Sequence, residues 1–140
     1  MGLRALIVDR SAVIRSVIKK VLVIMGADPS GCLEAADACQ ALQTLAEEQV
    51  DIILTDIHLP MADGLGFLAR LDEQEILERI PVVLVTAEAR QETIQRALTL
   101  GVKAHIRKPF RPEAIRAVLR QVLGDSDGNR AVQGLDGCDF

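Results

Sequence analysis

Four polar side chains with complementary chemistry stand at the ends of short segments that are expected to form strands: Asp9, Asp56, Thr86 and Lys108. A carboxylate can attack a phosphoryl group and form an acyl phosphate. The transfer also requires in-line positioning and neutralisation of the phosphoryl oxygens, for which proteins use a hard divalent cation, a lysine and a hydroxyl or amide donor. The four side chains would supply most of these parts if the fold brought them together. The inventory therefore indicates phosphoryl chemistry.

The apolar runs themselves predict strands. Unbroken, branched apolar residues occupy positions 6–8, 52–54 and 82–85, which is typical of strands that are covered on both faces in a parallel sheet. Two weaker strands are expected over residues 30–33 and 104–106, because helices would otherwise follow one another with no sheet between them. Sites in such sheets form beyond the carboxyl ends of the strands, which is where the four polar side chains are expected to lie.

Helical patterns fill the intervals between the strands. Apolar residues recur at spacings of three and four over five segments: residues 11–26, 37–48, 65–71, 89–100 and 112–123. Gly26 and Gly101 provide stops for the first and fourth of these helices, and the last is expected to end before Gly124. This regular alternation implies right-handed crossovers and an α/β fold with a doubly wound parallel sheet.

Composition limits the domain count and excludes several function classes. The 140 residues suit one domain, and only 2% are aromatic, which argues against base stacking, sugar stacking and aromatic cages. The net charge of −4 is concentrated near the C-terminus, so the rest of the chain offers no broad nucleic-acid footprint. We expect a domain over residues 1–123 and an acidic, Gly- and Asp-rich tail or linker stump over residues 124–140.

Membrane, export and redox signals are weak. The longest apolar run, residues 21–25, is far too short to cross a membrane, and the chain opens with no secretory leader pattern. Cys32, Cys39 and Cys138 lack metal-ligand spacing and fit reduced thiols better than a disulfide framework. The protein is therefore expected in the cytoplasm, without a membrane partner and without direct nucleic-acid binding.

Four motifs, in order and at matching spacings, resemble a known family. They are LIVD at residues 6–9, DIHLPMADG at 56–64, VLVTA at 83–87 and KPF at 108–110. Over residues 3 to about 123, the chain resembles the receiver domain of two-component response regulators, in the single-domain style of chemotaxis regulators. The resemblance implies a flavodoxin-like fold of five strand–helix units with strand order 2-1-3-4-5. It also implies a phosphorelay signalling protein with at most self-catalysed phosphotransfer and autodephosphorylation, and no conventional enzyme activity.

The resemblance assigns roles to the residues at the strand ends. Asp56 matches the acceptor of a phosphoryl group from a histidine kinase or a histidine phosphotransfer protein. Thr86 matches the hydroxyl that swings to the phosphoryl group, Ala87 follows it in the phosphoryl-binding loop, and Lys108 matches the lysine that pairs with the group. The bond between Lys108 and Pro109 is usually cis in the family. A downstream protein partner would respond to the phosphorylated state.

A magnesium pocket is implied by the same resemblance. Asp9, Asp56 and the main-chain carbonyl of His58 match its ligands, but Arg10 stands where the family usually has a second acid. A guanidinium cannot coordinate a cation and repels one, so Mg²⁺ binding is weakened. Two arrangements remain open. Arg10 either points outward and leaves a weak metal site, or forks onto Asp56 and makes the chain a pseudo-receiver, a phosphorylation-independent protein-interaction module.

The last expected strand and its flanking helices match the output surface of the family. His105 stands where the family often has Tyr or Phe, so its rotamer would report the switch, and a typical pKa of about 6.5 would make it sensitive to pH as well. Basic residues around it form either a solvated face or a surface that docks an acidic partner or a second copy through the last strand and last two helices. This basic face comprises Arg96, Lys103, His105, Arg107, Arg111 and Arg116.

Overall fold

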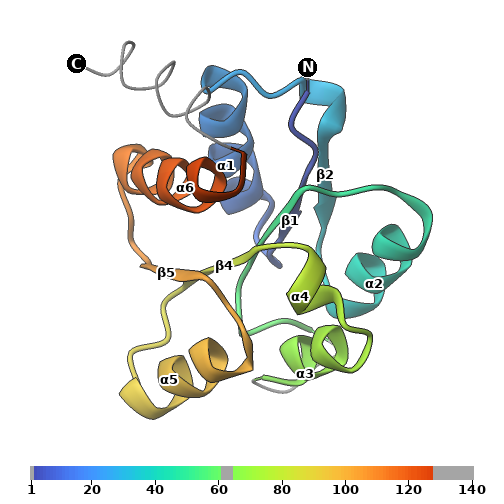
Figure 1. Cartoon of the computed structure of the whole chain (residues 1–140). Coiled ribbons are helices and arrows are strands. Elements are labelled where there is room, and N and C mark those ends of the chain that lie inside the picture. The colour runs from blue at the N-terminus through green and yellow to red at the C-terminus, as the bar shows by residue number, and fades with distance from the viewer. Residues whose placement is uncertain (1, 61–64, 128–140) are drawn as a thin grey trace.

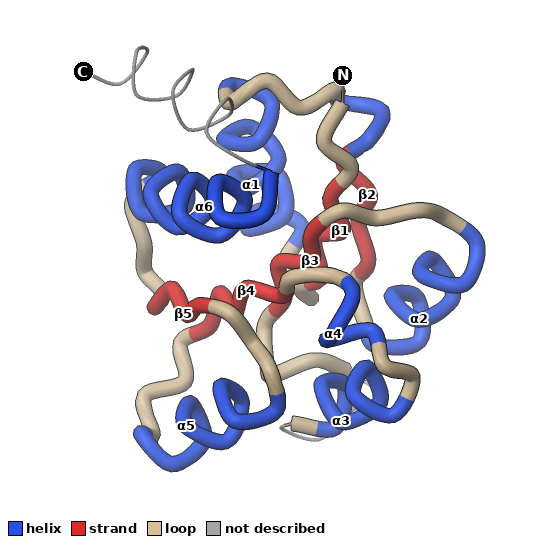
Figure 2. Tube along the Cα trace, in the orientation of Figure 1, coloured by secondary structure: helices blue, strands red, loops and turns tan. Residues whose placement is uncertain are grey.

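A five-stranded parallel sheet forms the centre of the molecule (Figure 2). The structure, a computed structural model of the chain, describes residues 2–60 and 65–127. The strands are β1 Ala5–Val8, β2 Cys32–Ala35, β3 Ile52–Thr55, β4 Val82–Thr86 and β5 Ala104–Arg107. Their order is β2-β1-β3-β4-β5, so the predicted class, parallel pairing and strand order are confirmed. β2 and β5 are the edge strands of this sheet.

Helices cover both faces of the sheet (Figure 1). They are α1 Ala12–Ile24, α2 Ala38–Glu47, α3 Gly66–Glu73, α4 Ile76–Arg79, α5 Gln91–Leu100 and α6 Pro112–Asp127. The pair α1 and α6 packs together on one face, and the other four helices lie on the opposite face. This three-layer arrangement is the one that regular alternation of strands and helices predicts.

Strand side chains alternate between two apolar cores, one on each face of the sheet. On β1, Leu6 and Val8 belong to the core beneath α2, α3 and α5, whereas Ala5 and Ile7 belong to the core beneath α1 and α6. All four side chains are buried. Phe67 on α3 is the largest fully buried side chain, and its neighbours in the core are aliphatic. Burial on both faces explains why β1 and most of β3 and β4 are apolar, whereas the edge strands β2 and β5 also contain charged or polar residues.

Two glycines mark the ends of helices, and a third glycine lies inside a helix. Gly26 and Gly101 adopt φ values of 110° and 127° just after α1 and α5, which confirms them as stops. Gly124 instead keeps its place inside α6, which continues to Asp127. The expectation that this helix ends before Gly124 is therefore wrong, because a glycine ends a helix only where the backbone turns out of it. The predicted domain boundary at residue 123 falls within α6.

The second strand begins later than the sequence indicated. Ser30 and Gly31 were expected in the strand, but they lie in a short 3₁₀ helix, and β2 starts at Cys32. The Asp28 side chain accepts a hydrogen bond from the Ser30 amide at 3.0 Å and caps this turn. A side-chain cap on a Pro-containing segment favours the turn over extended backbone.

The short helix α4 was not predicted. Glu75 adopts a left-handed φ of 61° between α3 and α4, a break that no glycine marks in the sequence. Ile76 and Leu77 are buried just beyond this break. Two adjacent apolar residues are too few to show a helical period, so the apolar pattern could not distinguish this helix from a loop.

Two expectations concern membranes and thiols. Within residues 2–60 and 65–127, no helix combines the length and the apolar character that a membrane span needs. Cys32 is buried and Cys39 is exposed, and both are free thiols, as predicted. Cys138 lies outside the described residues, as do residues 61–64 of the second motif and most of the expected tail.

Candidate functional site

Three charged side chains meet at the carboxyl edge of the sheet. The Nζ of Lys108 donates hydrogen bonds to Asp9 Oδ2 and to Asp56 Oδ2, each at 2.7 Å. Asp9 and Asp56 are 2% and 7% exposed, so both carboxylates are buried charges that share one cationic partner. The structure therefore brings together the two acids and the lysine that the sequence singled out.

Continued strand pairing places these side chains. The main-chain amides of Asp9, Asp56 and Lys108 each donate to a carbonyl of the neighbouring strand, at 3.0, 3.0 and 2.9 Å. Each of the three residues thus continues the hydrogen-bond pattern of the parallel sheet just past the end of its strand. This pairing fixes the position of the backbone that carries each side chain. The peptide bond between Lys108 and Pro109 is cis.

Hydrogen-bond donors occupy every carboxylate oxygen of the two acids. Lys108 holds one oxygen of each acid, as described above. The amide of Ser11 donates to Asp9 Oδ1 at 2.8 Å, and the amide of His58 donates to Asp56 Oδ1 at 3.1 Å. The site is therefore preorganised to hold two negative charges.

Opposing effects set the protonation states of the site. Burial raises the pKa of Asp56, but hydrogen bonds from Lys108, from Thr86 and from the His58 amide outweigh it and hold the pKa below its usual range. Burial lowers the pKa of Lys108, whereas its bonds to Asp56 and Asp9 raise it, and the net pKa is above the ordinary value. At neutral pH, the Asp56 carboxylate is ionised and lies beside the Lys108 ammonium.

Thr86 ends β4 at the same edge of the sheet. Its side chain is fully buried, and Oγ1 accepts a hydrogen bond from the Glu88 amide at 3.2 Å. Its hydroxyl also helps to lower the pKa of Asp56, so it acts on that carboxylate. Ala87, the next residue, is exposed. The structure thus places the predicted hydroxyl beside the acids and leaves its neighbour open to solvent.

A bridge that the sequence did not reveal joins the loops that follow Asp56 and Thr86. His58 Nε2 lies 3.1 Å from Glu88 Oε1, and the guanidinium of Arg90 holds both oxygens of the same carboxylate at 3.0 and 3.1 Å. Glu88 is 6% exposed, and the hydrogen bonds from Arg90 lower its pKa to about 2. The only available signal was that His58 and Glu88 each stand two residues after a site residue.

Stability is expected to depend on pH through Glu88. Because its pKa is lower in the folded protein, its carboxylate stabilises the fold above the ordinary value of 4.5, and this stabilisation is lost as the pH falls toward about 2. Urea unfolding at about pH 6 and about pH 3 should show a larger loss of stability for the wild type than for Glu88→Gln. The exposed Glu113→Gln is the control and should behave as wild type. Equal losses in the wild type and Glu88→Gln would contradict this role.

The Arg10 guanidinium does not make a bidentate contact with the Asp56 carboxylate. It is exposed, and its side chain makes no hydrogen bond or ion pair with any residue that the structure describes. The second arrangement considered for Arg10 is therefore wrong: the cation that contacts the Asp56 carboxylate is Lys108. Asp56 is consequently not blocked by the substitution.

The donor set does not fit the magnesium pocket that the resemblance implies. Among the residues that the structure describes, the candidates are two carboxylates, Asp9 and Asp56, and the main-chain carbonyl of His58, because Arg10 stands where the third acid is expected. Over the described ranges 2–60 and 65–127, no three His, Cys, Asp or Glu side chains gather so that they could hold a metal ion. Mg²⁺ demands near-octahedral oxygen ligands, and the carboxylate oxygens here already accept hydrogen bonds.

The His105 ring is partly shielded from solvent. Its Nε2 is buried and has no hydrogen-bond partner among the described residues, and the residue pairs with Leu84 across β4 and β5. Burial, and then the charge of Arg107, lower the pKa of His105. The expected sensitivity near neutrality is therefore displaced toward acidic pH, and the ring is neutral at pH 7.

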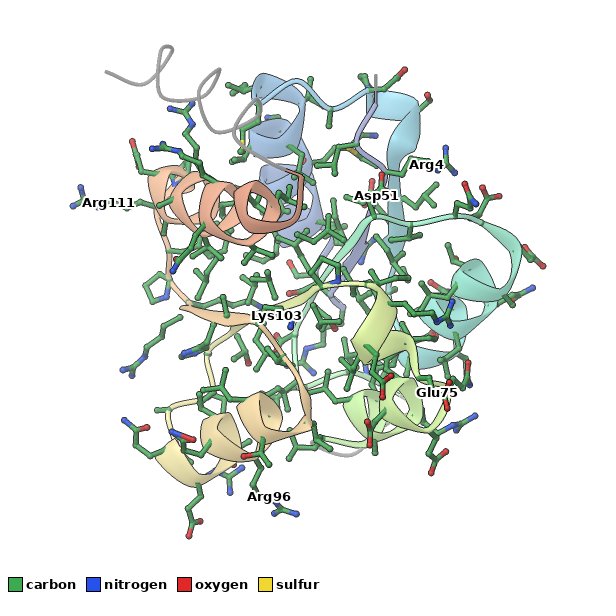
Figure 3. The ribbon with its side chains drawn as sticks, viewed as in Figure 1. Arg4, Asp51, Glu75, Arg96, Lys103 and Arg111 are labelled. Carbon is green, nitrogen blue, oxygen red and sulfur yellow. The ribbon has the colours of Figure 1, made fainter. Side chains whose placement is uncertain are left out.

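The basic face lies along the β5 side of the molecule. Figure 3 shows Arg96 pointing outward from α5 and Arg111 pointing outward just before α6, and these two helices flank β5 on opposite faces of the sheet. The cationic groups therefore form a broad rim around the edge strand and not one compact patch. Its exposed members are Arg96, Lys103, Arg107 and Arg111, and its half-buried members are His105 and Arg116.

Comparison with known proteins agrees with this geometry. A family model described as the response regulator receiver domain matches residues 5–120. The chemotaxis protein CheY homolog of Campylobacter jejuni is 32% identical over 132 residues, which cover 94% of this chain and 100% of that protein. The similarity thus spans the sheet, its helices and all the residues of the site.

Solved structures show the same fold. A CheY-like response regulator receiver domain protein from Methanospirillum hungatei has a TM-score of 0.79 at 26% identity, over 89% of this chain and 96% of that one. The receiver domain of the sensor histidine kinase PA1611 from Pseudomonas aeruginosa has a TM-score of 0.75 at 28% identity, over 89% and 99% of the two chains. That structure is described with a magnesium ion coordinated in its active-site cleft.

Proposed function

Because this chain belongs to the response regulator receiver domain family, we propose that Asp56 is its phosphoacceptor and that the donor is a histidine kinase or a histidine phosphotransfer protein. The observation that carries the proposal is the ionised Asp56 carboxylate, held at 2.7 Å by Lys108 at the carboxyl edge of the sheet. Receiver domains are signalling phosphoacceptors of two-component systems. The protein therefore acts as a substrate and switch, and not as a conventional enzyme.

The residues present account for the transfer step. The Asp56 carboxylate attacks the phosphorus of a phosphohistidine and forms an O–P bond, while the P–N bond breaks and its electron pair stays with the imidazole. Asp56 has no proton to lose, because its pKa is already low. Lys108 then pairs with the phosphoryl oxygens, and the Thr86 hydroxyl donates to them beside Ala87. Magnesium, which receiver domains generally bind at their acidic site, would find few ligands here, so we expect weak binding.

A change in the loop after β4 would carry the signal outward. The Thr86 hydroxyl now accepts from the Glu88 amide, and donating to a phosphoryl group would draw this loop toward Asp56. The adjoining basic face is the surface that we propose for an acidic downstream partner. Its exposed arginines and lysine favour an electrostatically steered encounter with such a protein. A homodimer through α5, α6 and β5, and a cytoplasmic location, stay predictions.

Mass spectrometry tests the proposal directly. The full chain is incubated with acetyl phosphate, and its intact mass is followed before and after brief alkaline treatment, which hydrolyses acyl phosphates. A gain of one phosphoryl group that is lost in base and maps to the peptide containing Asp56 supports the proposal. A base-stable gain, or a gain that maps to another peptide, contradicts it.

Thr86→Ala should separate phosphorylation from the switch. Without the hydroxyl, acetyl phosphate should still modify Asp56, at a rate within about threefold of wild type, because the nucleophile and Lys108 remain. Phosphorylation should change the His105 ring signals in NMR spectra of the wild type but leave them unchanged in Thr86→Ala. The exposed Thr99→Ala on α5 should behave as wild type. If the His105 ring signals changed in phosphorylated Thr86→Ala as much as in the wild type, Thr86 would have no role in the switch.

A further inference from the structure

The charges around Asp56 balance without a metal ion. Asp9 and Asp56 bring two negative charges into the site, and Lys108 brings one positive charge that contacts both of them at 2.7 Å. Arg10, the residue directly after Asp9, brings a second positive charge where the family usually has a third acid. The formal charge of this group of four residues is therefore zero. A divalent cation would leave it strongly positive.

Two other arginines near the site, Arg15 and Arg90, are already paired. Arg15 contacts Glu34 at 2.9 Å and also donates to the main-chain carbonyl of Asp9. Arg90 contacts Glu88 at 3.0 Å. Arg10 differs from both arginines because it is exposed and has no partner within the described residues. Its guanidinium can therefore turn toward a new anion without breaking an existing interaction.

Phosphorylation would create such an anion next to Arg10. A phosphoryl group carries close to two negative charges at neutral pH, in place of the single charge of the Asp56 carboxylate. Arg10 is joined to Asp9 by one peptide bond, and consecutive Cα atoms lie about 3.8 Å apart. Asp9 and Asp56 share one ammonium, so the Arg10 backbone stands at the rim of the site. A guanidinium offers two parallel N–H donors that match two phosphoryl oxygens.

We propose that Asp56 accepts its phosphoryl group without a divalent cation, with Arg10 and Lys108 supplying the positive charge that the phosphoryl oxygens need. The inference rests on the proposed function, because it takes Asp56 as the acceptor. With acetyl phosphate, a carboxylate oxygen of Asp56 attacks the phosphorus and forms the new O–P bond. The O–P bond to acetate breaks, and acetate leaves with its electron pair. No redox partner and no proton transfer are required.

Phosphorylation rates with and without chelator test this proposal. The full chain is incubated with acetyl phosphate in EDTA or in excess Mg²⁺, and the phosphorylated fraction is followed by intact mass. The wild-type rates should agree within about twofold. Arg10→Asp restores an acid, so its rate should fall about tenfold or more when EDTA replaces Mg²⁺. Arg10→Gln should be about tenfold slower than wild type in EDTA, and Mg²⁺ should restore little of the loss.

Arg79→Asp is the matched control, because Arg79 is an exposed arginine at the end of α4, just before β4 begins, and so lies at the edge of the sheet opposite the site. It should keep the wild-type rate in both conditions. A second readout does not depend on phosphorylation: calorimetric titration with Mg²⁺ should show at least about tenfold tighter binding to Arg10→Asp than to wild type. Equal Mg²⁺ affinities of Arg10→Asp and the wild type would show that Arg10 does not repel the cation.

The outcomes separate this inference from the proposed function. A wild type that is phosphorylated only with Mg²⁺ overturns the inference and leaves Asp56 as the acceptor. An Arg10→Gln variant that matches the wild type in EDTA also overturns it, because the guanidinium would then have no role. A chain that gains no phosphoryl group in any variant or condition overturns the proposed function itself, and the inference with it.

Discussion

Asp56→Asn is expected to gain no phosphoryl group from acetyl phosphate under conditions in which the wild type is modified. The amide is nearly the same size as the carboxylate, and its oxygen can still accept a hydrogen bond from Lys108. However, it carries no negative charge and is a far weaker nucleophile than the ionised Asp56 that the lowered pKa provides. The expected loss is complete within the detection limit of intact mass measurement.

A carboxylate outside the site provides the matched control for this substitution. Asp72 is exposed on α3, so Asp72→Asn changes the same functional group and the same net charge without touching Lys108. It should be phosphorylated at the wild-type rate. If Asp56→Asn gained a phosphoryl group as fast as Asp72→Asn, another residue would be the acceptor.

Lys108→Gln is expected to lower the free energy of unfolding by about 3 kcal/mol at pH 7. The substitution leaves Asp9 and Asp56, which are 2% and 7% exposed, without the cation that contacts both. Breaking a buried ion pair by removing one partner typically costs about 3–5 kcal/mol, because the remaining charge is buried without compensation. Lys108 keeps some contact with solvent, so we expect the lower end of this range. Urea unfolding measures the change.

The pH dependence identifies the cause of this loss. In the wild type, the lowered pKa of Asp56 stabilises the fold above the ordinary carboxyl pKa, and that contribution fades as the pH falls through the lowered value. In Lys108→Gln, burial acts on Asp56 without its main opposing hydrogen bond, so the ionised form opposes folding. The stability gap between the two proteins should therefore shrink as the pH falls and the acid takes up a proton.

Lys103 offers a control for the loss of a lysine charge. It is exposed directly before β5, and Lys103→Gln should change the free energy of unfolding by less than about 0.5 kcal/mol. A Lys108→Gln variant that resembles Lys103→Gln at pH 7 would show that solvent, and not the ammonium, compensates the two acids.

The sequence predicted the sheet and the site for the same physical reason. Strands that are buried on both faces are almost wholly apolar, so a polar residue after such a run indicates the carboxyl end of a strand, as at Asp9 and Asp56. Lys108 follows the less apolar edge strand β5, which was expected from the alternation of strands and helices. Parallel pairing then brings Asp9, Asp56 and Lys108 to one edge, although 99 residues separate the first from the last. Fold and site could be predicted together because both depend on the polarity of successive residues.

Contacts between loops could not be predicted in this way. His58 and Glu88 lie in different loops with no periodic pattern, and their bridge depends on side-chain directions that only the folded chain defines. The placement of Arg10 is a similar case. Its sequence position allowed a contact with Asp56, but in the folded chain Arg10 is exposed and Lys108 makes that contact. The break at Glu75 before α4 also left no apolar period to detect.

The position of β5 at the edge of the sheet has a consequence for the behaviour of the protein at high concentration. An edge strand presents unpaired main-chain amides and carbonyls, to which a strand of another molecule can add and begin an aggregate. β5 has only four residues; the exposed Lys103 directly precedes it, and the exposed Arg107 is its last residue. Two such strands would bring like charges together on approach, so the cations at this edge also protect the protein against self-association into fibres.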